Sequence, residues 1–303
     1  MQDRYLINRG GLCFRRLPGP QKGAGQHTLT GNIHRRVFDS ELLEEELEIL
    51  IYLPPGYSES DPWRYPVLYL HDGQNVFDEK SAVFGVEWGV DEAAERLIQE
   101  RKMEGIIVVA VANSPARIAL YTPFPDSALG GGQGKIYRDF LINELKPWID
   151  QSYPTTRKAQ ETALAGSSLG GLSALYVAWT RPDVFGMVAA ISPSLWWGGR
   201  GLITRIASDE KKARPHRIWI DMGTEESEDD ENENGVPDVI DDLRTLKAIL
   251  QAKGYKIDYD LFYREVSGAT HDEGSWASRI EDVLMALFPL GDKDRGLAIR
   301  PNF

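Results

Sequence analysis

The sequence predicts an α/β fold, with a mostly parallel sheet covered by helices on both faces. Residues 65–70 and 105–112 are almost continuously apolar, as expected of strands that are buried on both sides. Segments with helical periodicity separate such stretches, so strands and helices alternate along the chain. A chain of 303 residues is also long enough to bury one sizeable core.

The first predicted elements form an antiparallel hairpin at the edge of this sheet. Residues 33–38 and 46–53 alternate between polar and apolar side chains, which is the period of a half-exposed strand. The run Pro54-Pro55-Gly56 then ends the second strand. We expect Glu46 and Glu48 to lie on its solvent-facing side.

The remaining elements follow in alternation. Strands are predicted at residues 65–70, 105–112, 162–165, 185–192, 217–222 and 257–266. Helices are predicted at residues 86–101, 135–153 with an interruption near Pro147, 169–179, 238–253 and 276–288. We expect residues 1–30 to be an arm rich in Gly and Pro, residues 31–290 to form one domain, and residues 291–303 to be a tail.

The most informative motif is Gly166-Ser167-Ser168-Leu169-Gly170, a G-x-S-x-G sequence between a predicted strand and a predicted helix. In this context the pattern is typical of a nucleophile elbow, in which the serine occupies a sharp turn with its hydroxyl exposed. Small residues on either side are needed because a Cβ there would collide with the strand or the helix. Ser168 is therefore the candidate nucleophile; the alternative is a simple Gly/Ser turn.

A serine hydroxyl needs a general base, and the chain offers five histidines. His271 lies in the loop after the last predicted strand, where this type of fold would return a loop over the elbow. We therefore predict His271 as the base. His71 follows another strand near the elbow, and we expect it to be a structural hydrogen-bonding residue.

The base needs an acid, which in such hydrolases lies between the serine and the histidine along the chain. Asp221, Glu225, Glu226 and Glu228 all meet this condition, within or just after the strand at 217–222. Asp221 lies inside the strand and is expected to point into the sheet. We choose Glu226, with Glu225 as the second candidate.

The negative oxygen of a tetrahedral intermediate needs two converging donors, usually backbone N–H groups. One is expected from Leu169, directly after the nucleophile. The other is expected from the loop that follows the strand at 65–70, and we assign it to Gln74.

These motifs resemble those of the Putative esterase family of α/β-hydrolases. The resemblance rests on Tyr52–Tyr57, Tyr65–Asn75, Tyr121–Pro123, Gly166–Leu172, Ser192–Trp197, Asp221–Glu226 and Gly268–Asp272. The family includes enterobactin and other ferric-siderophore esterases, feruloyl and acetyl-xylan esterases, S-formylglutathione hydrolase and the antigen 85 mycolyltransferases. The resemblance implies an α/β-hydrolase fold with Ser168 and His271 in these roles. It also supports Glu226, because the family's acid commonly follows the Gly-Thr pair.

Three further side chains are candidates for contacting the substrate. Trp196 and Trp197 follow the strand at 185–192, and aromatic rings there would suit a planar acyl group or a sugar. Core packing is an equal alternative for either ring. Arg117 would hold an anionic or hydroxylated part of the ligand, unless it forms a structural salt bridge.

An acidic segment also matches the pattern D-x-[DN]-x-[DN]-G of calcium loops. Its candidate oxygen ligands are Asp230, Asn232, Asn234, Asp238 and Asp241. Asp replaces Glu at position twelve, and Pro237 has no N–H, so the segment departs from an EF-hand. The alternative is a disordered acidic insertion. Any calcium there would be structural, since the chemistry proposed above requires no cofactor.

Composition limits the remaining function classes. The net charge of −12 argues against a large basic surface for nucleic acid. The single cysteine, Cys13, excludes an intramolecular disulfide. No stretch has the length of apolar sequence that spans a bilayer, and no signal peptide opens the chain, so a cytoplasmic location is the default expectation.

We therefore predict a serine esterase that acts on a small-molecule ester, such as a siderophore or a feruloylated or acetylated carbohydrate. One alternative is an acyltransferase with the same three side chains. Another is a non-catalytic carbohydrate- or calcium-binding module on a hydrolase fold.

Overall fold

A computed structural model describes residues 27–60 and 62–291. Most of the predicted arm, including Cys13, and the predicted tail from residue 292 onward lie outside the described residues. Within the described part of the chain, no helix is both long enough and apolar enough to cross a membrane.

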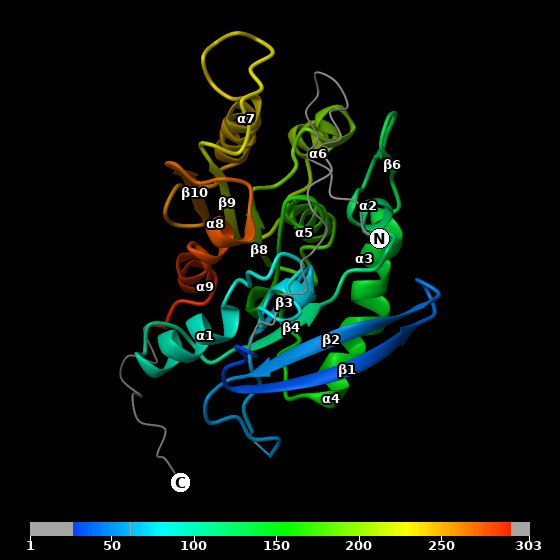
Figure 1. The fold of residues 1–303 in the computed structure, drawn as a ribbon, viewed down its shortest axis with the longest axis vertical. Helices are drawn as coiled ribbons and strands as arrows, with labels where there is room; N and C mark the ends of the chain where they lie inside the picture. Colours follow the sequence, from blue (N-terminus) through cyan, green and yellow to red (C-terminus); the bar gives the residue numbers. More distant parts are fainter. Residues whose placement is uncertain (1–26, 61, 292–303) are drawn as a thin grey trace.

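The described residues form one large sheet flanked by helices (Figure 1). The strands are β1 (Asn32–Ser40), β2 (Glu45–Leu53), β3 (Val67–Leu70), β4 (Ile107–Val111), β7 (Thr162–Ser167), β8 (Met187–Ile191), β9 (Arg217–Gly223) and β10 (Leu261–Val266), with a separate small pair β5 (Pro125–Asp126) and β6 (Gly130–Gly131). Their order in the large sheet is β1-β2-β4-β3-β7-β8-β9-β10. All pairs from β4 to β10 are parallel, whereas β1, β2 and β4 pair antiparallel. The prediction of a parallel sheet with an antiparallel edge hairpin is confirmed.

The helices are α1 (Val90–Gln99), α2 (Arg117–Tyr121), α3 (Gly134–Phe140), α4 (Lys146–Ser152), α5 (Leu169–Thr180), α6 (Trp197–Ser208), α7 (Asp238–Ala252), α8 (Glu273–Ala277) and α9 (Ile280–Leu287). A π-helical turn, η2 (Leu141–Leu145), joins α3 to α4, and two 3₁₀ turns are η1 (Gly73–Asn75) and η3 (Ala159–Glu161).

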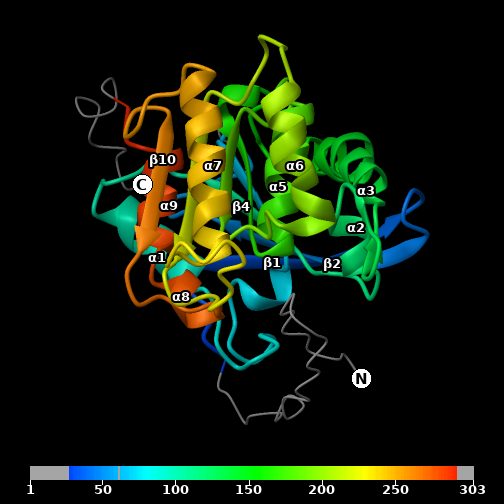
Figure 2. The ribbon, with the colours of Figure 1, turned by 90° about the horizontal axis from the view of Figure 1, so that it is seen from above.

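Two hydrophobic cores cover the two faces of the sheet. On one face, apolar side chains of α3, α4, α5, α6 and α7 pack against the strands. On the other, α1 and α9 bury residues such as Leu97 and Leu284. Figure 2 shows the sheet between these layers. Strand β7 lies between β3 and β8 with both of its faces covered, which explains why all of its residues are buried.

Several predicted boundaries are wrong for local reasons. The helix predicted at 86–101 begins only at Val90, because Gly89 takes a left-handed conformation with φ of 61°. The strand predicted from residue 257 begins at Leu261, since Asp258 has φ of 57° and turns the chain. The last predicted helix is two helices, α8 and α9, joined through Ser278 and Arg279.

Three further elements differ from the sequence prediction. The break near Pro147 is a π-helical turn that leads into α4, which places the proline in the first turn of that helix, where its missing N–H costs little. Helices α2 and α6 were not predicted. The first is only five residues long, and the second is interrupted by left-handed residues from Gly198 to Arg200, so neither gives a clear period.

Candidate active site

Ser168 lies at the sharp turn between β7 and α5, with φ of 54° and ψ of −122°. This conformation is strained for a residue with a side chain, and such strain persists only where the surroundings enforce it. A Cβ on Gly166 would lie 2.7 Å from the backbone of Gly170, so the turn can be this tight only with glycine at position 166. The elbow geometry predicted from the motif is therefore present.

His271 and Glu226 meet Ser168 from two separate loops. The His271 Nε2 atom lies 3.0 Å from Ser168 Oγ, and the His271 Nδ1 atom lies 2.8 Å from Glu226 Oε2. The Glu226 side chain is 2% exposed, whereas that of His271 is 33% exposed. The serine hydroxyl, the imidazole and the carboxylate thus form a continuous chain of hydrogen bonds that is open to solvent at the imidazole.

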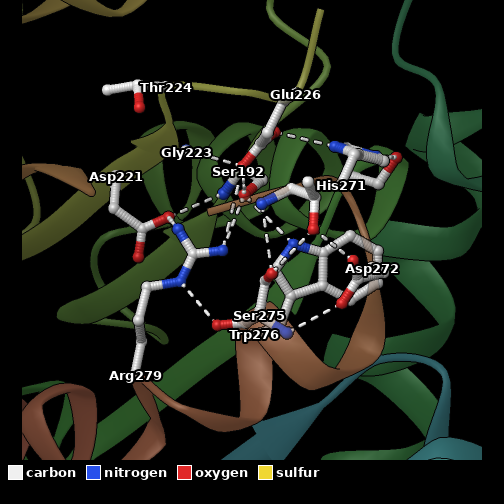
Figure 3. Close-up of polar contacts among 12 residues, drawn as sticks. Ser192, Asp221, Gly223, Thr224, Glu226, His271, Asp272, Ser275, Trp276 and Arg279 are labelled. Carbon is white, nitrogen blue, oxygen red and sulfur yellow. Dashed lines mark hydrogen bonds and ion pairs between the residues drawn. The ribbon is translucent and has the colours of Figure 1, made fainter. Parts of the chain in front are cut away.

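The second carboxylate oxygen of Glu226 is held by donors from the protein. Glu226 Oε1 accepts hydrogen bonds from Ser192 Oγ at 2.5 Å and from the Gly223 N–H at 2.6 Å. Trp276 Nε1 and Arg279 Nη2 each donate to Ser192 Oγ at 3.1 Å, as Figure 3 shows. The Trp276 indole also meets the His271 ring edge-on, at 5.0 Å between centroids. Glu226 and His271 are therefore both held in position by buried groups.

Asp221 lies behind this network and does not contact His271. It accepts hydrogen bonds from Arg279 Nη1 at 3.0 Å, from Trp219 Nε1 at 2.7 Å and from the Ser192 N–H at 2.9 Å. Burial raises the pKa of the Asp221 carboxyl to about 6, although Arg279 opposes the shift. Asp221 points into the sheet, as expected. Glu225 is exposed, and it is Glu226 that contacts the imidazole of His271.

The two predicted oxyanion donors both lie in first turns of helices. Leu169 opens α5 and Gln74 lies in η1, and backbone N–H groups at such positions have no acceptor within their own helix. The loop carrying Gln74 packs on the elbow, because a Cβ on Gly170 would lie 3.2 Å from Asp72 Oδ2. Gln74 Oε1 accepts the Asn113 N–H at 3.0 Å, which anchors the loop.

Arg117 is engaged in a bidentate ion pair with Asp72, at 2.7 Å for both contacts. Burial disfavours its charge, but the adjacent carboxylate of Asp72 outweighs this and raises the Arg117 pKa. The structural salt bridge considered from sequence is thus present, and it holds the loop that precedes Gln74. Substrate binding by Arg117 stays a prediction.

The two predicted aromatic side chains differ in exposure. Trp197 is 1% exposed and donates from Nε1 to the Phe124 carbonyl at 2.8 Å, so we assign it to the core and not to the substrate site. Trp196 is only partly buried and packs on the edge of the same core. His71 is fully buried, and burial lowers its pKa to about 3, which agrees with a structural role.

The candidate calcium loop is a tight turn before α7. Asp230 accepts the backbone N–H groups of Asn234 and Gly235, and the side-chain amides of Asn232 and Asn234 donate to Asp241 Oδ2. Asp238 accepts the Glu231 N–H through both oxygens, at 3.4 and 3.3 Å. Calcium binding by this loop stays a prediction.

Comparison with known proteins agrees with this architecture. Residues 40–287 match the family model described as Putative esterase. The chain belongs to this family. The family description and the esterases among the chain's relatives show that the protein is a carboxylic ester hydrolase.

Two relatives of this esterase are named as esterases of iron-binding siderophores. It is 27% identical over 238 residues to the ferri-bacillibactin esterase BesA of Bacillus subtilis, covering 71% of this chain and 78% of that one. It is 32% identical over 151 residues to the iron(III) enterobactin esterase of Escherichia coli K12, covering 48% of this chain and 34% of that one.

The fold is also similar to that of a solved enterobactin esterase from Shigella flexneri. The TM-score is 0.65 at 21% identity, covering 90% of this esterase and 64% of the other chain. The α/β-hydrolase fold expected from the sequence is confirmed.

Arg279, which lies 3.8 Å from Glu226, and Trp276, which contacts His271, are not identified by the sequence analysis. They belong to the helical segment after His271, and their spacing there is that of an ordinary amphipathic helix. Their position after the histidine loop is the only signal that could have suggested them.

Proposed function

We propose that this esterase hydrolyses its substrate through Ser168 as nucleophile, His271 as general base and acid, and Glu226 as the residue that orients His271. The single observation that carries the proposal is the hydrogen-bonded chain from Ser168 Oγ through His271 to Glu226, with distances of 3.0 and 2.8 Å. Distances in this range allow direct proton transfer.

The reaction would proceed in two steps. Ser168 Oγ attacks the ester carbonyl while His271 Nε2 takes the hydroxyl proton, and the N–H groups of Leu169 and Gln74 stabilise the oxyanion. His271 then returns the proton to the leaving alcohol, and an acyl-enzyme remains on Ser168. Water activated by His271 attacks this acyl group and releases the acid. The buried Glu226 carboxylate stabilises the imidazolium in each step.

For the substrate we propose a siderophore ester, with a feruloylated or acetylated carbohydrate as the second candidate. The names of the relatives support both classes, since they include siderophore esterases and an endo-1,4-beta-xylanase/feruloyl esterase of Xylanibacter ruminicola. The partly exposed Trp196 would supply an aromatic surface for either ligand. A panel of ferric-siderophore, feruloyl and acetyl-sugar esters, compared by kcat/KM, separates the two classes.

The proposed nucleophile is tested by Ser168→Ala with p-nitrophenyl acetate as substrate. We expect kcat to fall by about 10³-fold or more, because the variant lacks the hydroxyl proposed to form the acyl-enzyme. Ser208→Ala, at the exposed end of α6, is the matched control and should retain the parent activity. Circular dichroism verifies that both variants are folded.

Equal activity of Ser168→Ala and the parent would contradict this assignment. An inactive parent would favour the non-catalytic binding module. Adding an alcohol acceptor tests the acyltransferase alternative, which predicts that a transferred ester replaces the free acid as the main product.

A further inference from the structure

Three carboxylates converge at the start of α1, away from Ser168. Asp91 and Glu92 lie in the first turn of the helix, and Glu87 lies in the loop before it. One oxygen from each of the three side chains lies within 4.8 Å of one from each of the others. Asp91 is fully buried, while Glu87 and Glu92 are partly buried.

Each carboxylate uses one oxygen to hold the segment that precedes β1. Thr30 donates from its N–H to Asp91 Oδ2 at 2.7 Å and from its hydroxyl to Glu92 Oε1 at 2.8 Å. The Thr28 hydroxyl donates to Glu87 Oε1. These contacts tie the chain before β1 to the start of α1.

The other oxygen of each carboxylate has no hydrogen-bond partner among the described residues, although all three are buried. These atoms are Glu87 Oε2, Asp91 Oδ1 and Glu92 Oε2. A buried oxygen left without a donor costs free energy, and for an ionised group the cost is larger. A partner other than the described side chains would remove this cost.

A cation would be that partner. In the described part of the chain, no Lys or Arg forms an ion pair with any of these three carboxylates. The described residues therefore offer these three carboxylates hydroxyl and backbone donors but no positive charge.

We propose that Glu87, Asp91 and Glu92 bind a Ca²⁺ ion at the start of α1. Carboxylate oxygens are the hard ligands that Ca²⁺ prefers, at distances of about 2.3–2.6 Å. One oxygen from each side chain lies within 4.8 Å of the others, so small side-chain movements would bring all three to a single Ca²⁺ ion.

The ion would stabilise a region that touches the active site. The backbone N–H of Trp88, next to Glu87, donates to the carbonyl of Asn75 in η1, the turn that carries Gln74. The Trp88 ring also lies 6.0 Å from that of Trp276, which contacts His271. Calcium at this site would therefore fix the loop before α1 against both the oxyanion turn and the histidine loop.

The test is a thermal-unfolding titration of the full chain at pH 8 after treatment with chelator. We expect 1 mM Ca²⁺ to raise the melting temperature of the parent by about 3 °C or more, because the ion binds only the folded site. In the double variant Glu87→Gln with Glu92→Gln this rise should be lost. The same variant should melt above the parent in chelator, since the repulsion between like charges is removed.

The matched control separates this site from the predicted calcium loop. A variant with Asp230→Asn and Asp241→Asn keeps the cluster at α1 and should keep most of the calcium response. Tb³⁺ luminescence excited through tryptophan gives a second readout, because Trp88 adjoins Glu87. The signal should appear in the parent and be weaker in the single variant Glu92→Gln, which is a milder change than the double variant.

The same rise with Ca²⁺ in the Glu87/Glu92 variant as in the parent would overturn the proposal. So would a parent that responds to Mg²⁺ alone, or one that gains stability on acidification but not with Ca²⁺, which would indicate a proton shared among the carboxylates. None of these outcomes depends on whether Ser168 is the nucleophile.

Discussion

Carboxylates are buried in two places in the molecule, and the two sets differ in the groups that contact their oxygens. Behind the histidine loop, Asp221 and Glu226 share the guanidinium of Arg279, and donors from Ser192, Trp219 and Gly223 reach their oxygens. At the start of α1, three carboxylates each accept hydroxyl or backbone donors on one oxygen, and no basic side chain of the described residues forms an ion pair with them.

The difference lies in where the balancing charge comes from. Glu226, proposed above as the catalytic acid, lies beside His271, and the guanidinium of Arg279 is 3.8 Å from its carboxylate. Within the described part of the chain, the cluster at α1 has no basic partner, which is the pattern expected where an external cation completes the structure. Two changes test this contrast and a third tests another buried carboxylate, in order of expected effect.

The largest effect should come from Glu226→Gln. Removing the charge, with the shape nearly unchanged, should lower kcat by about 10³–10⁴-fold, since the imidazolium loses its stabilising partner. Glu225→Gln is the matched control next in the sequence and should retain the parent kcat, as Glu225 is exposed. Steady-state kinetics on one ester substrate measures both; a larger loss in Glu225→Gln would assign the acid to that residue.

The next effect should come from Arg279→Met. This change leaves Asp221 and Glu226 without a basic partner, as the carboxylates at α1 already are among the described residues. Two buried carboxylates would lose their shared positive charge, and breaking such a buried pair typically costs about 3–5 kcal/mol of unfolding free energy. The exposed bidentate pair of Arg244 with Glu265 provides the control, because Arg244→Met should cost about 1 kcal/mol or less. Urea unfolding measures both, and similar losses in the two variants would refute the internal balance.

The smallest effect should come from Glu273→Gln. Burial raises the pKa of Glu273 to about 6 from 4.5, so its ionised form is less favourable in the folded state than in the unfolded state. The folded protein therefore loses stability as the pH rises from about 4.5 to about 6, and the cost is fully present above that range. Glutamine removes it, so the variant should be more stable than the parent by about 1–2 kcal/mol at pH 8 and nearly equal to it at pH 4.

Urea unfolding at these two pH values checks the prediction for Glu273. The exposed Glu228→Gln variant serves as the control and should differ little from the parent at either pH. A stabilisation by Glu273→Gln that is equal at pH 4 and pH 8 would show that packing, and not ionisation, causes it.

The sequence predicts the central part of the site because its signals are local. Gly166 and Gly170 mark the elbow around Ser168, and His271 is the one histidine that follows the last strand. The acid is harder to assign, since the sequence offers four candidates within or just after the strand at 217–222. Only the fold shows that Asp221 points into the sheet while Glu226 reaches the imidazole.

The remaining features depend on contacts between distant segments. Arg279 meets Asp221 across 58 positions of sequence, and no pattern near either residue announces the pair. Asp91 and Glu92 look like acids that complement the dipole at a helix start, a common surface feature. Only the fold shows Asp91 buried and facing Glu87. Trp196 and Trp197 are adjacent in sequence, yet one is core and one is partly exposed, because α6 begins between them.

The hairpin at the start of the domain has a consequence for the molecule in solution. Strand β1 pairs only with β2 among the described strands, so its outer side presents backbone groups that another chain could join. Arg35, Arg36 and Asp39 are exposed along it. Charged side chains of this kind make strand addition from a neighbouring copy unfavourable. They thereby protect the edge strand β1 against aggregation.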